Sequence, residues 1–399
     1  MNTLKKAAVF LLVSAIAWSF SGCNQSVSKK QQMVAGWQQS TATAKIPLVE
    51  DLIERGELEE AKKTLEKCLQ GDPQSALLHL LAGRIHFIEG RTEQARSCFE
   101  KAVELDPELS EGWHQLGSLA VMENDYDLAL NYYGKTLALQ PARAEYRASV
   151  ADILVQLGQI EQAKETLQAG LRQQPRNLEL LLAMARLHHQ LGDIQQAIQT
   201  YEQALLMHGN HPGVLEPCGY AYVALKKWDK AAGKFTALLE KCQPETVHYN
   251  VVLRSLAMCS FNAGNYNLAL DCYDKLSVVN REDPEIWVGM AQSALGLDDT
   301  KRAIHCADKA LQLKPTWSEA YAVLASAQYM QGQYEKSLDT FHVIIHDDEL
   351  SGFAWFMMGR CYRQMGQTAE AESAFERAEQ LDPDSDLVTA FLKETVQSL

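Results

Sequence analysis

Few side chains in this sequence are spaced for chemistry, and the clearest pair is two histidines. His342 and His346 are four residues apart and precede Asp347, Asp348 and Glu349. That spacing predicts two imidazoles on one face of a helix, where they could bind a metal ion. The sequence specifies no third ligand, so we expect no metal ion and no other cofactor.

A second candidate is a phosphate-binding loop, suggested by Gly134, Lys135 and Thr136. The motif requires a glycine five residues before Gly134, where the sequence has Ala129, and the segment falls inside an expected helix. The sequence also has no HExxH, Gly-x-Ser-x-Gly or CxxC motif. We therefore do not expect an enzyme.

Cysteine is the remaining reactive side chain. Apart from Cys23 there are eight, an even number that would suit disulfides in an oxidising compartment. They are Cys68, Cys98, Cys218, Cys242, Cys259, Cys272, Cys306 and Cys361. Their spacing is unlike a disulfide framework, and most fall within expected helices, where a buried thiol behaves as a small hydrophobe. We expect mostly free, buried thiols; one or two bridges are the alternative.

The elements that carry these residues follow a period of 34 residues. Proline recurs with this period at Pro73, Pro107, Pro141 and Pro175. Small residues recur in the same phase. They are Ala61, Ala95, Ala129, Ala163, Ala197 and Ala231 and, after a shift of four, Ala269, Ala303, Ser337 and Ala371. The period predicts six units over 42–245, an insertion at 246–249, four units over 250–385 and a capping helix over 386–399.

Within one unit, the pattern resembles the tetratricopeptide repeat. The unit 110–143 has Trp113, Gly117, Tyr126 and Ala129 at that family's spacing. The resemblance implies an all-α solenoid of about ten helix-turn-helix units in a right-handed superhelix. With each unit numbered from 1, a small residue at position 8 should face the alanine at position 20. Aromatic residues at positions 4 and 24 should fill the space beside it, and proline at position 32 should end the second helix.

Residues 1–22 have the pattern of an export signal. Lys5 and Lys6 precede an uncharged stretch, 7–20, that is too short to cross a bilayer as a helix. The next residues, Ser-Gly-Cys ending at Cys23, resemble the lipobox of bacterial lipoproteins. The resemblance implies removal of the leader and lipid attachment at Cys23, followed by a polar, flexible tether within 23–41. An ordinary signal peptide with a chance cysteine is the alternative.

In the tetratricopeptide family, ligands lie on the concave surface lined by the first helix of each unit. Here the corresponding positions combine arginine with aromatic residues, histidine and methionine, a composition typical of protein-binding surfaces. The predicted partner-binding groove consists of Arg84, Phe87, Arg186, His189, Tyr220, Arg254, Met258, Phe261, Tyr329, Phe356, Arg360 and Arg363. The resemblance implies protein partners, as peptide or helical segments, and the arginines would suit an acidic segment. Packing against neighbouring repeats is the alternative role of these side chains.

The overall charge is acidic, with 37 Lys and Arg against 51 Asp and Glu and a net charge of −14. A nucleic-acid partner is not expected, because it would require a basic surface. Glutamate occupies position 2 of five units. These residues are Glu111, Glu145, Glu179, Glu285 and Glu319. A carboxylate in the first turn complements the helix dipole, so we assign these glutamates to helix stability rather than to the groove.

Together these patterns predict a membrane-anchored periplasmic scaffold that mediates protein–protein interactions. Asn24 follows the lipobox cysteine, which favours the outer membrane in the lipoprotein family. Among such lipoproteins, the resemblance implies assembly of an envelope machine such as a pilus or a secretion system. The alternatives are a scaffold of an exopolysaccharide export complex and, from another class, a metal-dependent enzyme that uses His342 and His346.

Overall fold

The computed structural model describes residues 33–34, 36–244, 246–347 and 349–382. This part of the chain consists of α-helices and turns and contains no strand. None of its helices is both long enough and apolar enough to span a membrane. The predicted signal peptide 1–22, the lipidation site Cys23 and the predicted cap 386–399 lie outside the described residues.

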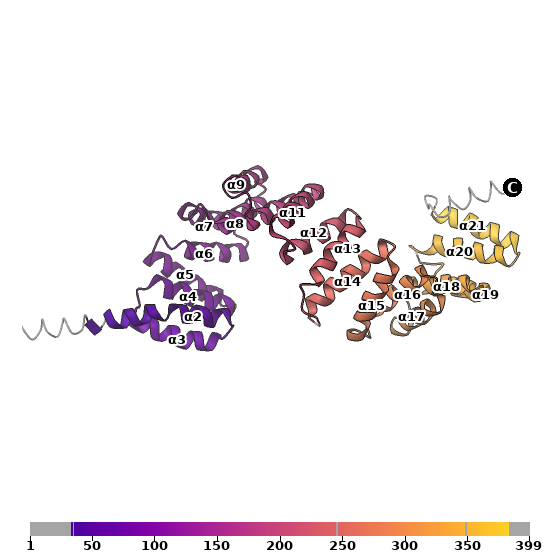
Figure 1. Ribbon diagram of the computed structural model, residues 1–399, viewed down its shortest axis with the longest axis horizontal. Coiled ribbons are helices and arrows are strands. Elements are labelled where there is room, and N and C mark those ends of the chain that lie inside the picture. Colours follow the sequence, from indigo (N-terminus) through magenta and orange to yellow (C-terminus); the bar gives the residue numbers. More distant parts are fainter. Residues whose placement is uncertain (1–32, 35, 245, 348, 383–399) are drawn as a thin grey trace, which may run out of the picture. The chain divides into compact units, whose positions relative to one another are not determined.

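Helices α2 to α21 follow one another as pairs joined by tight turns (Figure 1). The first helices of the pairs are α2 (Ile46–Glu54), α4 (Ala76–Ile88), α6 (Ser110–Met122), α8 (Ala144–Gln156), α10 (Leu178–Gln190), α12 (Pro212–Ala224), α14 (Val247–Asn262), α16 (Pro284–Gly296), α18 (Ser318–Met330) and α20 (Ser351–Gln364). The second helices are α3 (Leu58–Gly71), α5 (Thr92–Leu105), α7 (Tyr126–Leu139), α9 (Ile160–Gln173), α11 (Ile194–His208), α13 (Trp228–Leu239), α15 (Tyr266–Val279), α17 (Thr300–Leu313), α19 (Tyr334–Phe341) and α21 (Thr368–Leu381). The predicted all-α fold of helix-turn-helix repeats is confirmed.

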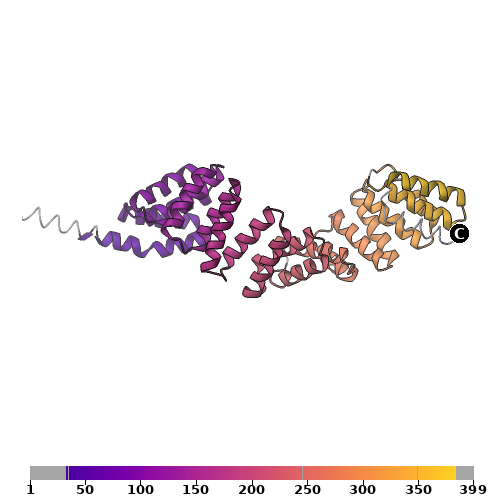
Figure 2. The same cartoon turned by 90° about the horizontal axis from the view of Figure 1, so that it is seen from above.

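The chain divides into two compact units, Met1–Leu187 and His188–Leu399, which are described separately. Within each unit, the two helices of a pair pack against each other. Helices α20 and α21, for example, run side by side in both views (Figure 1, Figure 2).

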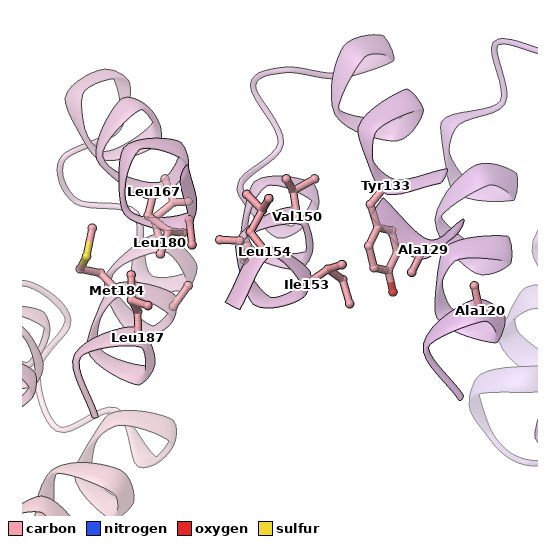
Figure 3. Close-up of a cluster of buried hydrophobic side chains, with 14 residues drawn as sticks. Ala120, Ala129, Tyr133, Val150, Ile153, Leu154, Leu167, Leu180, Met184 and Leu187 are labelled. Atoms are coloured by element: carbon pink, nitrogen blue, oxygen red, sulfur yellow. The ribbon is translucent and has the colours of Figure 1, made fainter. Parts of the chain in front are cut away.

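The core of the unit 1–187 is formed by one apolar stripe of each helix. In α9 the buried residues are Ala163, Leu167 and Gly170, the spacing of a single helix face. Figure 3 shows the cluster that includes Ala129 and Tyr133 of α7. Ala129, at position 20 of its unit, is fully buried at 0% exposure. Burial of this stripe, more than intrinsic helix propensity, stabilises helices of this length.

In the pairs with glycine at position 8, that glycine packs closely against an aromatic ring. A Cβ atom added at Gly117 would lie 2.4 Å from the ring of Tyr133, and one added at Gly83 would lie 2.4 Å from the ring of Phe99. These rings occupy position 24. These contacts agree with the expectation that an aromatic residue at position 24 fills the space beside position 8. Positions 8 and 20 also face each other in the repeat 318–351, where Ser337 Oγ at position 20 donates to the backbone oxygen of Ala325 at position 8 at 2.8 Å.

The turn between the two helices of a pair contains one residue with a left-handed backbone. Most are glycine, which adopts positive φ without strain. The glycines are Gly56, Gly90, Gly158, Gly192, Gly264, Gly332 and Gly366, and the other units have Asn124, Lys226 and Asp298. Lys226 has φ 53°, although it lacks the short polar side chain that eases this conformation in asparagine and aspartate.

Side chains at position 4 bond to the turn that precedes their own helix. Trp113 Nε1 donates to the carbonyl oxygen of Pro107 at 2.9 Å, and Trp287 Nε1 donates to that of Arg281 at 2.8 Å. The same contact with the carbonyl six residues upstream is made by His79, Arg147 and Tyr321. These bonds satisfy carbonyl groups that lie beyond the end of a helix.

Ion pairs also connect consecutive repeats in the unit 1–187. Lys62 of α3 pairs with Glu89 at the end of α4, and Arg96 of α5 pairs with Glu123 at the end of α6. Both pairs join position 21 of one repeat to position 14 of the next.

The described part of the predicted tether departs from the expectation. Residues 36–44 are helical, and Ala42 is only 3% exposed. The backbone oxygen of Gln38 lies 3.0 Å from the place where Gly71 of α3 would carry a Cβ atom. This segment therefore packs on the first repeat rather than forming a flexible tether, because its alanine can be buried while its polar residues stay exposed.

Several helices differ in length from their counterparts, and two of them, α14 and α19, bear on the predictions. The insertion at 246–249 extends a helix: Thr246 Oγ1 accepts a hydrogen bond from the backbone N–H of Tyr249 at 3.1 Å, and α14 reaches 16 residues. Helix α19 is shorter, with 8 residues, and 342–346 form turns. His342 and His346 therefore do not share a helix face, which corrects the geometry expected from their spacing.

Candidate partner-binding face

Within each compact unit, the first helices of consecutive repeats lie beside one another. They form a surface that we call the first-helix face. In the unit 1–187, His114 Nε2 of α6 lies 3.2 Å from Ser149 Oγ of α8. In the unit 188–399, the hydroxyl groups of Tyr220 of α12 and Ser255 of α14 are 3.2 Å apart. The predicted groove residues can be assessed on this face within each unit.

In the unit 1–187, the predicted residues have different environments. Arg84 is half-buried. Phe87 is partly buried and packs on the core cluster that contains Phe99, as the alternative packing role predicts. Arg186 donates to Asp152 Oδ2 at 3.3 Å, so its charge already has a partner.

On α12 and α14, two predicted residues are exposed. Tyr220 is 40% exposed and Met258 is 36% exposed. Arg254 pairs with Asp283, and its Nη1 lies 2.9 Å from Glu285 Oε2. The ring of Phe261 lies 5.6 Å from that of Tyr266, within its own repeat.

On α18 and α20, the predicted residues mostly contact one another or the core. The guanidinium carbon of Arg360 lies 4.8 Å from the ring centre of Tyr329. Phe356 is only 5% exposed and its ring lies 5.8 Å from that of Phe375, so its assignment to the groove is corrected to the core. Arg363 of α20 is exposed. His189, which lies on α10, is exposed as well.

The positive charge of the face is therefore smaller than the sequence indicated. Two of the predicted arginines, Arg186 and Arg254, are paired with carboxylates of the same face. Glu285 at position 2 is one of those partners, so this glutamate contributes to the face as well as to the first turn of its helix. A groove selected for acidic partners does not follow from this arrangement.

A cavity of about 360 Å³ opens on the first-helix face of the unit 1–187. It is lined by Glu111, His114, Gln115, Arg143, Glu145, Tyr146, Ala148, Ser149, Asp152 and Glu179, which come from α6, α8, α10 and the turn before α8. Sequence reasoning missed its carboxylates. The signal was present, since Glu111, Glu145 and Glu179 recur every 34 residues, but it was assigned to helix dipoles alone.

His114 forms the aromatic part of this cavity together with Tyr146. Its ring centre lies 5.1 Å from those of Tyr133 and Tyr146. Burial lowers the pKa of His114, and the charge of nearby Glu145 acts in the opposite direction. A neutral imidazole is therefore favoured at pH 7.

Opposing effects act on the pKa of Asp152, whose side chain is 50% exposed. Burial raises its pKa, while the charge of Arg186 and the hydrogen bond from it lower the pKa. The direction of the net shift is upward, so the reduced hydration of this carboxylate, which is still 50% exposed, outweighs the effect of Arg186 on its pKa.

The residues that the structure describes contain no group of three or more His, Cys, Asp and Glu side chains that could hold a metal ion. All eight cysteines beyond Cys23 are free thiols. Six are buried, and Cys98 and Cys242 are half-buried. Burial raises the pKa of Cys218 to about 12 and those of Cys259 and Cys272 to about 11, which disfavours reactive thiolates.

Three family models match parts of the chain. The model described as the TPR domain of cytochrome c-type biogenesis protein H matches residues 107–213. A model described as tetratricopeptide repeat matches 52–118, and the model of anaphase-promoting complex (cyclosome) subunit 3 matches 297–378. These segments fall within the helix pairs described above.

Individual proteins are similar to parts of the chain. Anaphase-promoting complex subunit 3 of Schizosaccharomyces pombe is 25% identical over 179 residues, which cover 45% of this chain and 26% of that protein. Lipopolysaccharide assembly protein B of Escherichia coli K12 is 24% identical over 198 residues, which cover 48% of each chain. The chain thus spans about a quarter of the first relative and about half of the second. A tetratricopeptide repeat protein of Parabacteroides merdae has a solved structure that is 21% identical, covers 63% of this chain and 98% of that chain, and superposes with a TM-score of 0.46.

Proposed function

We propose that this chain, an all-α array of tetratricopeptide units, is a non-catalytic, membrane-anchored periplasmic scaffold that binds protein partners on its first-helix face. The observation that carries the proposal is the exposure of Tyr220 and Met258 on adjacent first helices. Aromatic and methionine side chains are enriched at protein-binding surfaces, where they provide large and adaptable contacts.

The sequence pattern around Cys23 supports an anchor in the cell envelope. A basic start, a short apolar stretch and small residues before cysteine are the features of a lipoprotein signal. Two similarities support a role in envelope assembly. One is the match of 107–213 to the cytochrome c-type biogenesis protein H model, and the other is the likeness to lipopolysaccharide assembly protein B. We favour assembly of an envelope machine such as a pilus or a secretion system, with attachment to the outer membrane.

The anchor is tested by cell fractionation of Cys23→Ala. We expect the variant to move from the membrane fraction to the soluble periplasmic fraction, because several lipid chains are needed for stable attachment and the variant would carry none. Cys98→Ala is the matched control and should stay with the membrane. Membrane retention of Cys23→Ala would contradict the proposed anchor.

The binding face is tested by photo-crosslinking in cells. A benzoylphenylalanine at Met258 should give a discrete adduct with a partner protein, whereas the same residue at the exposed Gln199 of the second helix α11 should not. Equal adducts at both positions, or none at Met258 or at Tyr220, would argue against partner binding on this face.

A further inference from the structure

The cavity between α6, α8 and α10 already holds a guanidinium group of the chain itself. Arg143 Nη2 lies 3.2 Å from Glu145 Oε1, and Arg143 Nη1 donates to the hydroxyl of Tyr146 at 3.4 Å. The guanidinium carbon is 5.2 Å from the centre of the Tyr146 ring. A carboxylate beside an aromatic face is the arrangement that proteins use to bind a cationic side chain.

A second guanidinium occupies the same surface one helix further on. Arg186 of α10 donates to Asp152 of α8 at 3.3 Å. The contact joins two consecutive first helices across the cavity lining. The face therefore binds a cationic group at two places, and in both cases this group is an arginine side chain of the same chain.

The carboxylates of the cavity outnumber these two cations. Glu111, Glu145, Asp152 and Glu179 line it, whereas Arg143 is the only cation of the lining and Arg186 lies beside it. Glu111 and Glu179 have no ion-pair partner among the residues that the structure describes. Two negative charges thus lack compensation, on either side of the site that Arg143 occupies.

We propose that this cavity binds a basic, extended segment of a partner protein, whose arginine or lysine side chains pair with Glu111 and Glu179. The inference rests on the proposed scaffold function and names the chemistry of its partner. Because the cavity is negatively charged, the partner segment should be positively charged. The arginines in the sequence had instead suggested a negatively charged partner. Tyr146 is only 2% exposed, so the half-buried ring of His114 is the one that offers apolar contact to the methylene groups of such side chains.

The test uses the purified full-length chain and fluorescein-labelled dodecapeptides of repeating Gly-Ser-Arg or Gly-Ser-Glu. Fluorescence anisotropy should show binding of the arginine peptide that weakens as salt is raised, and no binding of the glutamate peptide. The double substitution Glu111→Gln and Glu179→Gln should raise Kd for the arginine peptide about tenfold, the effect of losing two exposed ion pairs.

The control double substitution, Glu335→Gln and Glu370→Gln, removes two first-turn carboxylates from second helices of the unit 188–399 and should leave Kd unchanged. Thermal melting of both doubles confirms that they are folded. Equal Kd for wild type and both doubles would overturn the proposal. So would binding of the glutamate peptide, or displacement of the arginine peptide by spermidine at equal charge, since a small polyamine is not a protein segment.

Failure of this inference can be separated from failure of the scaffold function. If Met258 crosslinks to a partner in cells but the peptide results are negative, the scaffold stands and the basic-segment site is wrong. If the peptide binds as expected but no partner is crosslinked at Met258 or Tyr220, the site stands and the scaffold proposal fails.

Discussion

Glycine at position 8 is the residue on which the packing of a pair depends most directly. Where position 8 is glycine, the ring at position 24 fills the volume that a side chain would need. Other repeats have alanine at position 8, as at Ala325 beside Phe341, so the close contact belongs to the glycine pairs. In the pair α6 and α7, Gly117 meets the ring of Tyr133, whose hydroxyl lies 3.1 Å from Ser118 Oγ. Moving that ring would also break this hydrogen bond.

We expect Gly117→Ala to lower the free energy of unfolding by about 1–3 kcal/mol, the cost of overpacking a tight contact. The added Cβ would lie 2.4 Å from the ring of Tyr133, so the ring or the helix must move. Urea denaturation followed by circular dichroism measures the change.

Gly134→Ala is the control in the same helix pair. Gly134 lies inside α7, and a Cβ there would meet nothing within 4 Å. This substitution should stabilise the protein by about 0.5–1 kcal/mol, because alanine favours helix over glycine. If both alanine variants changed stability in the same direction, packing against Tyr133 would not be the cause.

Residue types at positions 8, 20 and 24 were predictable from the period, but their contacts were only partly so. The ring at position 24 lies beside glycine at position 8, and in one repeat Ser337 at position 20 bonds to Ala325 at position 8, as the pattern implied. The pairing of Arg254 was not predictable, because Asp283 and Glu285 lie 29 and 31 residues further along the chain. Such contacts depend on the rotation between repeats, which a sequence period does not specify.

At the level of elements, each pair is closed by a turn with a left-handed residue, and Lys226 is the exception in residue type. A lysine Cβ crowds the following carbonyl oxygen at positive φ, at a cost of about 1–2 kcal/mol per residue. Its backbone N–H nevertheless donates to Val223 O at 2.8 Å, so the turn forms. The helix pair therefore carries local strain that glycine would remove.

We expect Lys226→Gly to raise the free energy of unfolding by about 1 kcal/mol, because the relief of strain exceeds the extra entropy that glycine gives the unfolded chain. Gly192→Ala, at the equivalent position of the pair α10 and α11, should lower it by about the same amount. Both are measured by urea denaturation. A destabilised Lys226→Gly would show that the lysine side chain, not the backbone, determines stability there.

The existence and order of these helices followed from the periodicity of proline and of small residues, whereas their irregular ends did not. Phe341 ends α19 early, and no proline or glycine marks that end in the sequence. The sequence did not predict the helix over 36–44, because the segment is mostly polar and nothing in it indicated that Ala42 would be buried. Local composition cannot show which of these residues finds a neighbouring surface on which to pack.

At the level of the whole molecule, the thiols are distributed over both compact units and report on their opening. Cys68 is buried in the unit 1–187, and Cys218, Cys259, Cys272, Cys306 and Cys361 are buried in the unit 188–399. A buried thiol reacts only when its surroundings open, and a raised pKa slows the reaction further.

We expect Ellman's reagent at pH 8 to modify Cys98 and Cys242 rapidly in the folded protein and the six buried thiols only after urea is added. A Cys23→Ala background keeps the N-terminal thiol out of the count. The rapid phase should disappear in Cys98→Ser with Cys242→Ser. Fewer than eight thiols in urea without reductant would contradict the free state of these cysteines.

The ion pairs between position 21 of one repeat and position 14 of the next have a consequence for how such an array can lengthen. The repeat 76–109 contains one partner of each kind. Glu89 forms an ion pair with Lys62 of the preceding repeat, and Arg96 forms one with Glu123 of the following repeat. A tandem duplication of these 34 residues would place the arginine of one copy beside the glutamate of the other. Both original pairs would survive and a third would form, so the added copy would arrive with its electrostatic contacts already matched.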